Sequence, residues 1–366
     1  MVCPSQPLLV PTEASNYVMI KRLELRNFRC FQHLDLSLKQ FNIVVGESGS
    51  GKTALLESIF LLAGGSPEIY FRIRQWRGFS RSLNLTGYRE SYRSIFRDLF
   101  YNFDSDNGAI LSFEDDRTGS RKLEIAYSDS AISGLDLEGS EPHAFTLSPI
   151  NFKWIVEGRV HNTSASIKEG KFTFEGTAPV APLVYYNSVN VSSFENSSAF
   201  SALNQKFRAT PLIAVIAEIY PQVKDISLEL IAGDATLCVA TLLDERLPLG
   251  DLSGGVAKFV SLALGILANP KGTIIVDEFE SGFYYRNIPT VWKALVKLAT
   301  QEQVQLVVST HSYEFLKAAS PVLASNGISK NSQLLRAEIN KVGEHVIRKI
   351  PADAFEAATS QDFEVR

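Results

Sequence analysis

The stretch GESGSGKT, residues 46–53, constrains this chain more than any other feature of its sequence. Gly46, Gly51, Lys52 and Thr53 match the spacing G-x-x-x-x-G-K-[ST], between the apolar run FNIVV and the helix-like segment ALLESIFLLA. A bound triphosphate is wrapped by backbone N–H groups, so the chain must approach it closely, and glycines permit that approach. The stretch therefore predicts a phosphate-binding loop between a strand and a helix.

The whole loop is expected to line a nucleotide site, which gives eight candidate residues: Gly46, Glu47, Ser48, Gly49, Ser50, Gly51, Lys52 and Thr53. Lys52 is expected to reach the β- and γ-phosphates, and the Thr53 hydroxyl to ligate Mg²⁺. The positive end of the following helix adds to the attraction for the anion. A glycine-rich turn that binds nothing is the alternative. The loop leaves the class of enzyme open, because kinases, GTPases, helicases and transporters share it.

Length and charge set limits on the rest. The 366 residues allow about two to three average domains, or one large α/β domain with an inserted lobe. Hydrophobic residues make up 45% and charged residues 21% of the chain, as in an ordinary globular protein. The net charge of −4 argues against a protein that coats nucleic acid, so any such binding requires a local patch.

Cysteine usage and hydropathy indicate the compartment. The three cysteines, Cys3, Cys30 and Cys238, are scattered and odd in number, which argues against a disulfide framework, so we expect a cytoplasmic protein. The apolar run at residues 259–268 is far shorter than the ~20 residues of a membrane-spanning helix, so we expect a buried helix and no membrane partner. Residues 1–18 lack the basic start of a signal peptide and are expected to form a disordered leader.

Apolar periodicity divides the remaining chain into a split head and an insert. Residues 19–45 predict three short strands, the last of which leads into the phosphate loop. Residues 109–187 predict several strands within an inserted α+β lobe at 65–225. In the last third of the chain, helices alternate with continuous apolar strands, which indicates a parallel sheet buried on both faces. We therefore expect an α/β head, with a mixed or parallel core sheet and an N-terminal antiparallel β subdomain, built from residues 19–64 and 226–366.

Two adjacent carboxylates, Asp277 and Glu278, end the apolar strand TIIV. In P-loop enzymes the first acid of such a pair holds the Mg²⁺ shell, and the second orients or deprotonates the attacking water. A strand that ends in solvated acids is the alternative. His311 follows the next apolar strand, where its imidazole is expected to contact the γ-phosphate, although a lone histidine is more often structural.

Ser253, Gly254 and Gly255, within LSGG, open a long apolar helix and form a second candidate anion site. Alone, Ser-Gly-Gly is a common turn. The order phosphate loop, LSGG, DE and His makes the motif specific. Because one chain already has its own phosphate loop, we expect the second site to serve the nucleotide of another copy. The implied assembly is a head-to-tail pair with two ATP molecules between phosphate loop and LSGG.

Together these motifs resemble the ABC-type ATPase heads of the RecF/SMC/OLD group, in particular the stand-alone AAA family ATPases of bacteria. The resemblance runs through IKRLELRNFRCF, GESGSGKTALLESI, LSGG, TIIVDEFESG and STHSYEFL. It implies a P-loop NTPase of the ABC-ATPase head type that hydrolyses ATP with Mg²⁺. By matched position it implies a role for each motif residue: Lys52 and Thr53 for phosphate and Mg²⁺, Asp277 for Mg²⁺, Glu278 as the catalytic base, Ser253 as the signature in trans and His311 as the switch.

The chain departs from this group in three places. Val256, Ala257 and Lys258 follow LSGG, where RecF and SMC heads usually have Gln or Glu. Residues 280–285, ESGFYY, resemble OLD-like ATPases more than the D-loop of transporters, and no residue stands out as the Q-loop glutamine. OLD nucleases carry a C-terminal nuclease domain, whereas 55 residues follow His311 here, so we expect no intrinsic nuclease activity.

An arginine-rich segment leaves the regulated partner open. Residues 71–100 contain no lysine and seven arginines among aromatic residues: Arg72, Arg74, Arg77, Arg81, Arg89, Arg93 and Arg97. They form a candidate patch for nucleic acid, because arginine pairs with phosphate and stacks on rings; docking on an acidic protein and a solvated helix are the alternatives. Two functions follow for a homodimer or higher oligomer. One is a clamp of RecF type on double-stranded DNA, and the other is a regulatory or sensor ATPase of a phage-defence system that holds or releases a protein effector.

Overall fold

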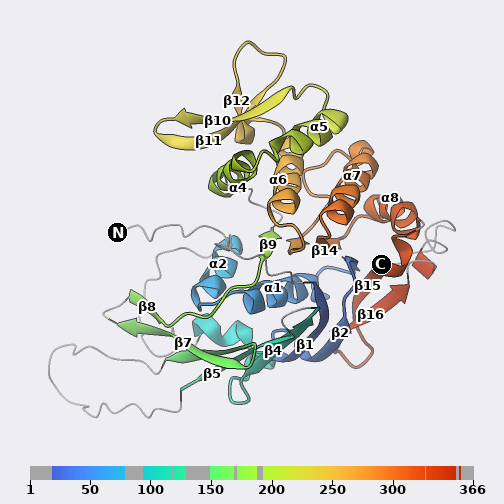
Figure 1. Ribbon diagram of the computed structural model, residues 1–366. Helices are drawn as coiled ribbons and strands as arrows, with labels where there is room; N and C mark the ends of the chain where they lie inside the picture. The colour runs from blue at the N-terminus through green and yellow to red at the C-terminus, as the bar shows by residue number, and fades with distance from the viewer. Residues whose placement is uncertain are drawn as a thin grey trace.

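Two sheets, with a helix between them, form the body of the protein (Figure 1). The computed structural model describes residues 19–78, 94–116, 119–128, 149–168, 171–187, 193–325, 327–351 and 354–355. The predicted leader at residues 1–18 lies outside these ranges.

The central sheet has six strands in the order β16-β15-β3-β14-β13-β9, and only β16 runs antiparallel to its neighbour. Its strands are β3 (Phe41–Val45), β9 (Leu183–Tyr186), β13 (Thr273–Val276), β14 (Gln305–Thr310), β15 (Ser332–Ile339) and β16 (His345–Pro351). The strand sequences FNIVV and TIIV are apolar because both faces are covered. Val44 joins the core on the α1 side, whereas Ile43 and Val45 join the core on the other side. The predicted mixed core sheet is confirmed.

The second sheet is antiparallel and has the strand order β2-β1-β4-β5-β6-β7-β8. Its strands are β1 (Ile20–Phe28), β2 (Phe31–Ser37), β4 (Ala109–Asp115), β5 (Ser120–Tyr127), β6 (Ile150–Val156), β7 (Arg159–Lys168) and β8 (Lys171–Glu175). Leu23 and Leu25 of β1 alternate with polar neighbours and share one apolar core with Leu55 and Ile59 of α1 (Lys52–Ala63). This sheet therefore covers α1 from the side opposite the central sheet.

Strands of the predicted inserted lobe, residues 65–225, pair with strands outside that range. β4 is hydrogen-bonded to β1, so the strands of the insert complete the sheet that the N-terminal strands begin. β9 pairs in parallel with β13 and forms an edge of the central sheet. The predicted boundaries therefore do not separate two sheets. Pairing between distant strands is decided by the folded structure, which local periodicity does not report.

A layer of helices covers the other face of the central sheet (Figure 1). Its helices are α4 (Ser193–Gln205), α5 (Ala209–Ile219), α6 (Gly254–Ala268), α7 (Ile288–Gln301) and α8 (Tyr313–Ala324). α6 is buried from Gly255 to Leu267, which confirms the predicted buried helix. The small sheet β10-β11-β12 lies beyond α4 and α5, with strands β10 (Asp225–Ile231), β11 (Asp234–Ala240) and β12 (Leu247–Pro248).

The remaining elements are short. They are α2 (Glu68–Trp76) and the 3₁₀ turns η1 (Arg97–Leu99), η2 (Tyr101–Phe103), η3 (Leu249–Asp251), η4 (Tyr285–Asn287) and η5 (Ser329–Asn331). None of the helices in the described part of the chain has the length and apolar character needed to cross a bilayer.

Candidate active site

The three motif strands are neighbours in the central sheet. β14 pairs in parallel with β3 on one side and with β13 on the other. Since the carboxyl ends of parallel strands meet at one edge, the phosphate loop after Val45, the acids after Val276 and His311 after Thr310 lie at the same edge. The sequence predicted each motif at the end of a strand, and the structure adds the order of the strands.

Two glycines of the phosphate loop have no room for a side chain. A Cβ on Gly46 would lie 2.1 Å from the carbonyl oxygen of Ala337, and one on Gly51 would lie 2.9 Å from Cys30 Sγ. Gly49 has a φ of +79°, but a Cβ there would meet nothing within 4 Å. Gly46 and Gly51 are therefore required by close packing, and Gly49 by its left-handed backbone.

Lys52 begins α1 and folds back over the phosphate loop. Its Nζ donates hydrogen bonds to the carbonyl oxygens of Gly46, at 2.7 Å, and Glu47, at 2.8 Å. Burial lowers the pKa of the Lys52 ammonium, while the nearby carboxylates of Asp277 and Glu278 act in the opposite direction. The ammonium is thus held inside the loop, next to the N-terminal N–H groups of α1 that favour an anion.

Thr53 and Asp277 meet at the same edge. Thr53 Oγ1 donates a hydrogen bond of 3.1 Å to Asp277 Oδ2. Hydroxyl and carboxylate oxygens suit Mg²⁺, which is usually bound by one or two carboxylates together with water and substrate phosphates. Among the described residues, no group of three or more His, Cys, Asp or Glu side chains is arranged to hold a metal ion. The pair therefore fits a Mg²⁺ ion that is bound largely through its nucleotide.

Asp277 is also held by two hydroxyls that sequence reasoning missed. Ser309 of β14 donates to Asp277 Oδ1, and Tyr185 of β9 donates to Oδ2 at 3.4 Å. Both side chains are buried, and burial raises the pKa of the Tyr185 hydroxyl well above its ordinary value. The signal for Ser309 is its place: it is polar and follows the apolar run LVV at the end of its strand. Tyr185 gives no comparable signal in the sequence.

Glu278 has a left-handed backbone, with a φ of +48°, which is uncommon for a residue other than glycine. Its N–H donates to Ser309 Oγ at 2.9 Å, and its carbonyl accepts from Lys258 Nζ at 2.9 Å. Asp277 is buried, whereas Glu278 is half-buried. The two adjacent acids therefore have different surroundings, as different roles require.

A third carboxylate, that of Glu280, lies next to His311. Glu280 Oε1 accepts a hydrogen bond of 2.7 Å from the backbone N–H of His311. Its Oε2 is buried and has no hydrogen-bond partner among the described residues. His311 follows β14, which lies between β3 and β13, and the contact of its imidazole with the γ-phosphate stays a prediction.

The LSGG motif opens α6, as predicted. Ser253 is the residue before the helix, and its side chain does not cap the first turn. Gly255 packs against the loop after the acids, where a Cβ would lie 2.8 Å from the carbonyl oxygen of Gly282. Within the described part of the chain, no hydrogen bond or ion pair joins Ser253, Gly254 or Gly255 to the phosphate loop of the same chain.

Two arginines of the predicted patch form ion pairs within the chain. Arg72 pairs with Glu195 at 2.7 Å, and Arg77 pairs at 2.6 Å with Glu57, a buried residue of α1. Burial raises the pKa of Glu57, and the neighbouring guanidinium groups of Arg29 and Arg77 lower it. These ion pairs argue against a free phosphate-binding stripe at Arg72 and Arg77.

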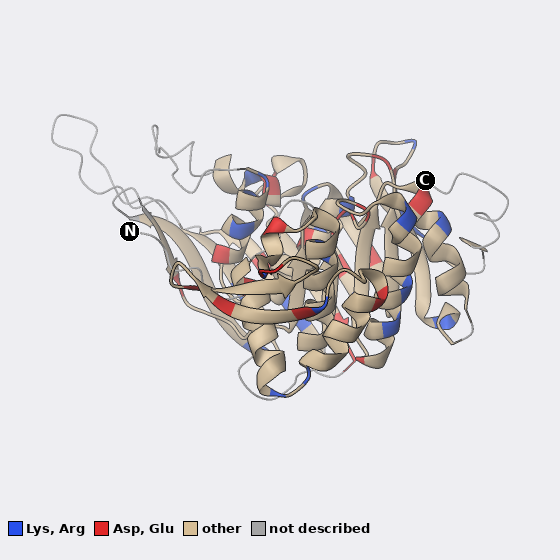
Figure 2. Ribbon diagram, turned by 90° about the horizontal axis from the view of Figure 1, so that it is seen from above, with Lys and Arg blue, Asp and Glu red and all other residues tan. Residues whose placement is uncertain are grey.

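Two further arginines of the patch contact aromatic side chains. Arg74 donates to the Tyr70 hydroxyl at 3.2 Å, and the Arg97 guanidinium lies 4.2 Å from the centroid of the Phe103 ring. Figure 2 shows acidic and basic positions interspersed over the described ribbon. Three members of the patch lie outside the described residues: Arg81, Arg89 and Arg93.

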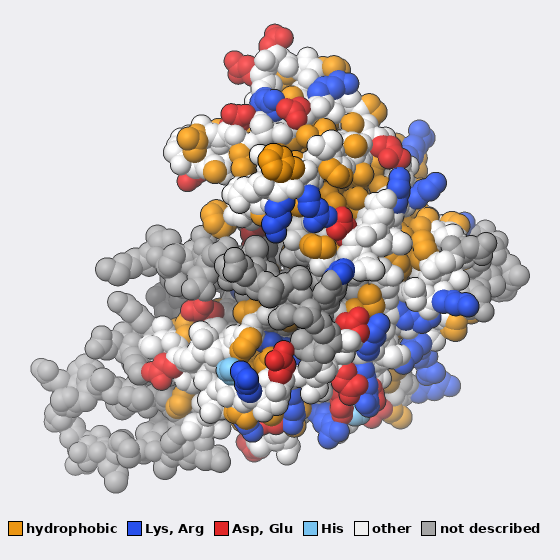
Figure 3. Space-filling model, in the orientation of Figure 1, with side chains coloured by type: hydrophobic (Ala, Val, Ile, Leu, Met, Phe, Trp, Pro, Cys, Tyr) orange, Lys and Arg blue, Asp and Glu red, His pale blue; other side chains and the backbone are white. Residues whose placement is uncertain are grey.

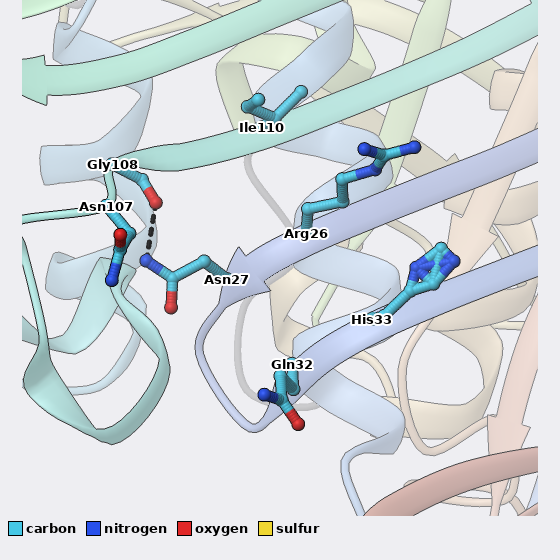
Figure 4. A pocket seen from close by; sticks show the side chains of 7 residues that line it. All are labelled: Arg26, Asn27, Gln32, His33, Asn107, Gly108 and Ile110. Carbon is cyan, nitrogen blue, oxygen red and sulfur yellow. Dashed lines mark hydrogen bonds between the residues drawn. The ribbon is translucent and has the colours of Figure 1, made fainter.

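An open pocket lies on the outer face of the antiparallel sheet (Figure 4). It is lined by Arg26, Asn27, Gln32, His33, Asn107, Gly108 and Ile110. The Asn27 amide donates to the carbonyl of Gly108. Leu25, next to Arg26 on β1, points into the core with α1, so the pocket lies on the other side of the sheet. It contains no residue of the phosphate loop or LSGG, neither acid of the Asp277–Glu278 pair, and not His311.

One family model covers all four motifs. The model described as "AAA domain, putative AbiEii toxin, Type IV TA system" matches residues 41–317. The chain belongs to this AAA domain family. The matched span begins at β3, before the phosphate loop, and ends within α8, after His311.

Curated relatives of this AAA family protein include one that matches along most of its length. An "ATP/GTP phosphatase" of Helicobacter pylori is 20% identical over 365 residues, covering 86% of this chain and 91% of the relative. Two others match over short stretches. The RecF protein of Actinobacillus pleuropneumoniae is 55% identical over 47 residues, 13% of each chain, and the OLD nuclease of Thermus scotoductus is 39% identical over 59 residues, 16% of this chain and 11% of the nuclease. The chain is a P-loop ATPase of the RecF/OLD type.

Two solved structures share the fold of this AAA family protein. An SMC head bound to the C-winged helix domain of ScpA is 14% identical, with a TM-score of 0.50 over 91% of this chain and 98% of the head. An SMC head with an extended coiled coil, bound to the C-terminal domain of ScpA from Pyrococcus furiosus, is 11% identical, with a TM-score of 0.50 over 94% and 99%. The likeness shows the fold alone, and it confirms the predicted ABC-ATPase head type.

Proposed function

We propose that this ATPase hydrolyses ATP with Mg²⁺ at composite sites, each shared by two chains in a head-to-tail pair, and that the ATP-bound pair controls a partner. The observation that carries the proposal is the meeting of Thr53 Oγ1 and Asp277 Oδ2, at 3.1 Å, beside the left-handed Glu278. The phosphate loop and the two acids stand far apart in the sequence, and a P-loop ATPase needs them together.

Each residue at the edge of the sheet has a place in this reaction. Water attacks the γ-phosphorus, the bond from this phosphorus to the β,γ-bridging oxygen breaks, and ADP and phosphate are released. Glu278 takes the proton of the water, and Asp277, held by Ser309 and Tyr185, keeps its orientation. A Mg²⁺ ion held by Thr53 and Asp277 would neutralise charge on the phosphates. Lys52 adds a further positive charge.

The LSGG segment supports a second chain at the site. Ser253 does not cap its own helix, and within the described residues it is not bonded to its own phosphate loop. A hydroxyl and N–H groups at the start of α6 therefore stay free to hold the phosphates of a nucleotide bound to another copy. The proposed pair contains two such sites, and each chain contributes to both.

A protein effector is better supported than DNA as the controlled partner. Arg72 and Arg77 are engaged in ion pairs, which removes charge from the surface predicted for nucleic acid. Large hydrophobic side chains are exposed in the helical layer and the small sheet: Phe207 is 93% exposed, and Leu230 and Leu242 are each 80% exposed. Figure 3 shows hydrophobic side chains gathered over this part of the molecule. Exposed apolar surface of this kind is typical of protein contacts.

Two comparisons bear on the partner. The family description names a Type IV toxin–antitoxin system, which supports a regulatory or sensor ATPase that holds or releases a separate protein in phage defence. The stretch shared with RecF supports the alternative, a clamp on double-stranded DNA. We place the effector first because two of the described arginines, Arg72 and Arg77, are held in ion pairs.

ATP turnover with and without DNA separates these candidates. We would measure the wild-type protein and Glu278→Gln with Mg²⁺, each with and without double-stranded DNA, at two salt concentrations. Turnover that requires Glu278 and ignores DNA supports the effector, whereas DNA stimulation that fades with salt supports the clamp. Turnover that is unchanged in Glu278→Gln contradicts the assigned base. Supercoiled plasmid in the same reactions is expected to stay intact, since we expect no nuclease activity.

A further inference from the structure

Lys258 lies in the second turn of α6 and is buried, with 6% of its surface exposed. Its Nζ donates two hydrogen bonds of 2.9 Å, to the carbonyl oxygens of Glu278 and Ser281. The ammonium also lies 5.5 Å from the centroid of the Phe283 ring. The side chain therefore ties the helix that LSGG opens to both ends of the short segment that follows Asp277.

A buried lysine in this place is not explained by packing. Among the described residues no carboxylate lies within ion-pair distance of the Lys258 ammonium. Burial lowers its pKa to about 8, although the nearby carboxylates of Glu280, Glu278 and Asp277 act in the opposite direction. A buried charge that lacks an ion pair costs free energy, and a methionine would fill similar space without that cost. The two hydrogen bonds to main-chain carbonyls offset part of this cost. The same hydrogen bonds hold the two carbonyls in place, which gives the buried lysine a structural role.

The carbonyl of Glu278 belongs to a residue with an unfavourable backbone. A left-handed φ of +48° at a residue with a side chain persists only where the surroundings fix it. The N–H of Glu278 is held by Ser309 Oγ and its carbonyl by Lys258 Nζ, so the two peptide groups of this residue are fixed from opposite elements, β14 and α6.

We propose that Lys258 is a positioning residue, which fixes the backbone of Glu278 in its left-handed conformation and links it to the Ser253–Gly255 segment of the same chain. The inference rests on the proposed function. In the head-to-tail pair, the Ser253–Gly255 segment binds the nucleotide of the second chain, whereas Glu278 acts on the nucleotide of its own chain. Lys258 therefore connects the two ATP sites of the pair through a direct contact between α6 and the base.

Lys258→Met tests this link, with Lys293→Met as the matched control. Lys293 is exposed on α7 and has no part in the site. We expect kcat for ATP to fall about tenfold or more in Lys258→Met, with KM and nucleotide affinity little changed, because the loss concerns orientation of the base. Two connected sites predict a cooperative dependence of the wild-type rate on ATP concentration, and we expect Lys258→Met to lose this cooperativity. Lys258→Arg restores part of kcat, since a guanidinium also donates to carbonyls.

The result that overturns the inference is a folded Lys258→Met protein with the kcat and cooperativity of the wild type. If this variant does not fold, Lys258→Gln, which keeps a donor, is measured in the same way: an intermediate kcat supports the inference, and a wild-type value overturns it. A wild-type protein without turnover, or turnover independent of Glu278, contradicts the proposed function instead. Turnover that requires Glu278 but not Lys258 contradicts the inference alone.

Discussion

The hydroxyl of Thr53 lies 3.1 Å from a carboxylate oxygen of Asp277, although 224 residues separate them in the chain. The contact exists because β14 lies between β3 and β13 and places the ends of these strands at one edge. Two motifs that were recognised separately thus become one site, and changes on either strand are expected to affect the same reaction.

Glu278→Gln is expected to lower kcat for ATP by about 100-fold or more, because the amide cannot accept the proton of water. Nucleotide binding is expected to persist, since Lys52 and the loop glycines are untouched. Steady-state turnover and titration with a fluorescent ATP analogue measure the two properties. Glu229→Gln, at an exposed position of β10, serves as the control and should behave as wild type.

Ser309→Ala is expected to reduce kcat by about tenfold, because its hydroxyl both donates to Asp277 and accepts the N–H of Glu278. The matched control is Ser312→Ala, three residues along the chain. Ser312 caps α8 by accepting from the N–H of Phe315, so its loss costs about 1 kcal/mol of stability and leaves turnover intact. Equal kcat values in the two variants would show that the Ser309 hydroxyl has no part in the reaction.

Arg121→Met is expected to lower the free energy of unfolding by about 3 kcal/mol, because it leaves buried carbonyls without a donor. Arg121 is buried on β5 and donates to the carbonyl oxygens of Leu62, Gly64 and Pro179, which joins the antiparallel sheet to the end of α1. Lys122→Met is the control, since Lys122 forms only a partly exposed pair with Glu124, where a change within about 0.5 kcal/mol is expected. Urea unfolding measures both, and similar losses would contradict this role of Arg121.

Cys30 is expected to react slowly with iodoacetamide in the native protein. Burial raises the pKa of its thiol from 9.0 to about 11, so at pH 8 about 100-fold less thiolate is present than in an ordinary thiol. Because the pKa is raised, the rate should increase with pH up to about 11. Mass spectrometry of Cys30 peptides, with urea-unfolded protein as the reference, measures it. A native rate equal to the unfolded rate would be inconsistent with this burial.

Sequence reasoning was most successful where function is contained in a continuous motif. The phosphate loop, the Asp277–Glu278 pair and the LSGG helix are each defined by adjacent residues, and the structure places each at a strand or helix end as expected. The strand FNIVV is likewise a continuous segment. Successive side chains of a strand point to opposite faces, so Val44 joins one core and Ile43 and Val45 join the other.

The remaining parts of the site depend on contacts between distant segments. Ser309, Tyr185 and Lys258 are single polar residues in apolar surroundings, and they gain a role only because β9, β14 and α6 lie around Asp277 and Glu278. The strand pairing of the predicted lobe at residues 65–225 depends on such contacts too. Periodicity identified its strands, but not that β4 would pair with β1 and β9 with β13.

The strand order also has a consequence for synthesis on the ribosome. β3 is made long before both of its neighbours, β14 and β15. The antiparallel sheet is complete much sooner, because all its strands precede β9. A nascent chain therefore carries a finished antiparallel sheet beside an unpaired apolar strand from the synthesis of β8 until that of β14, which exposes it to aggregation during that time. The nucleotide site is assembled only after β14 has been made.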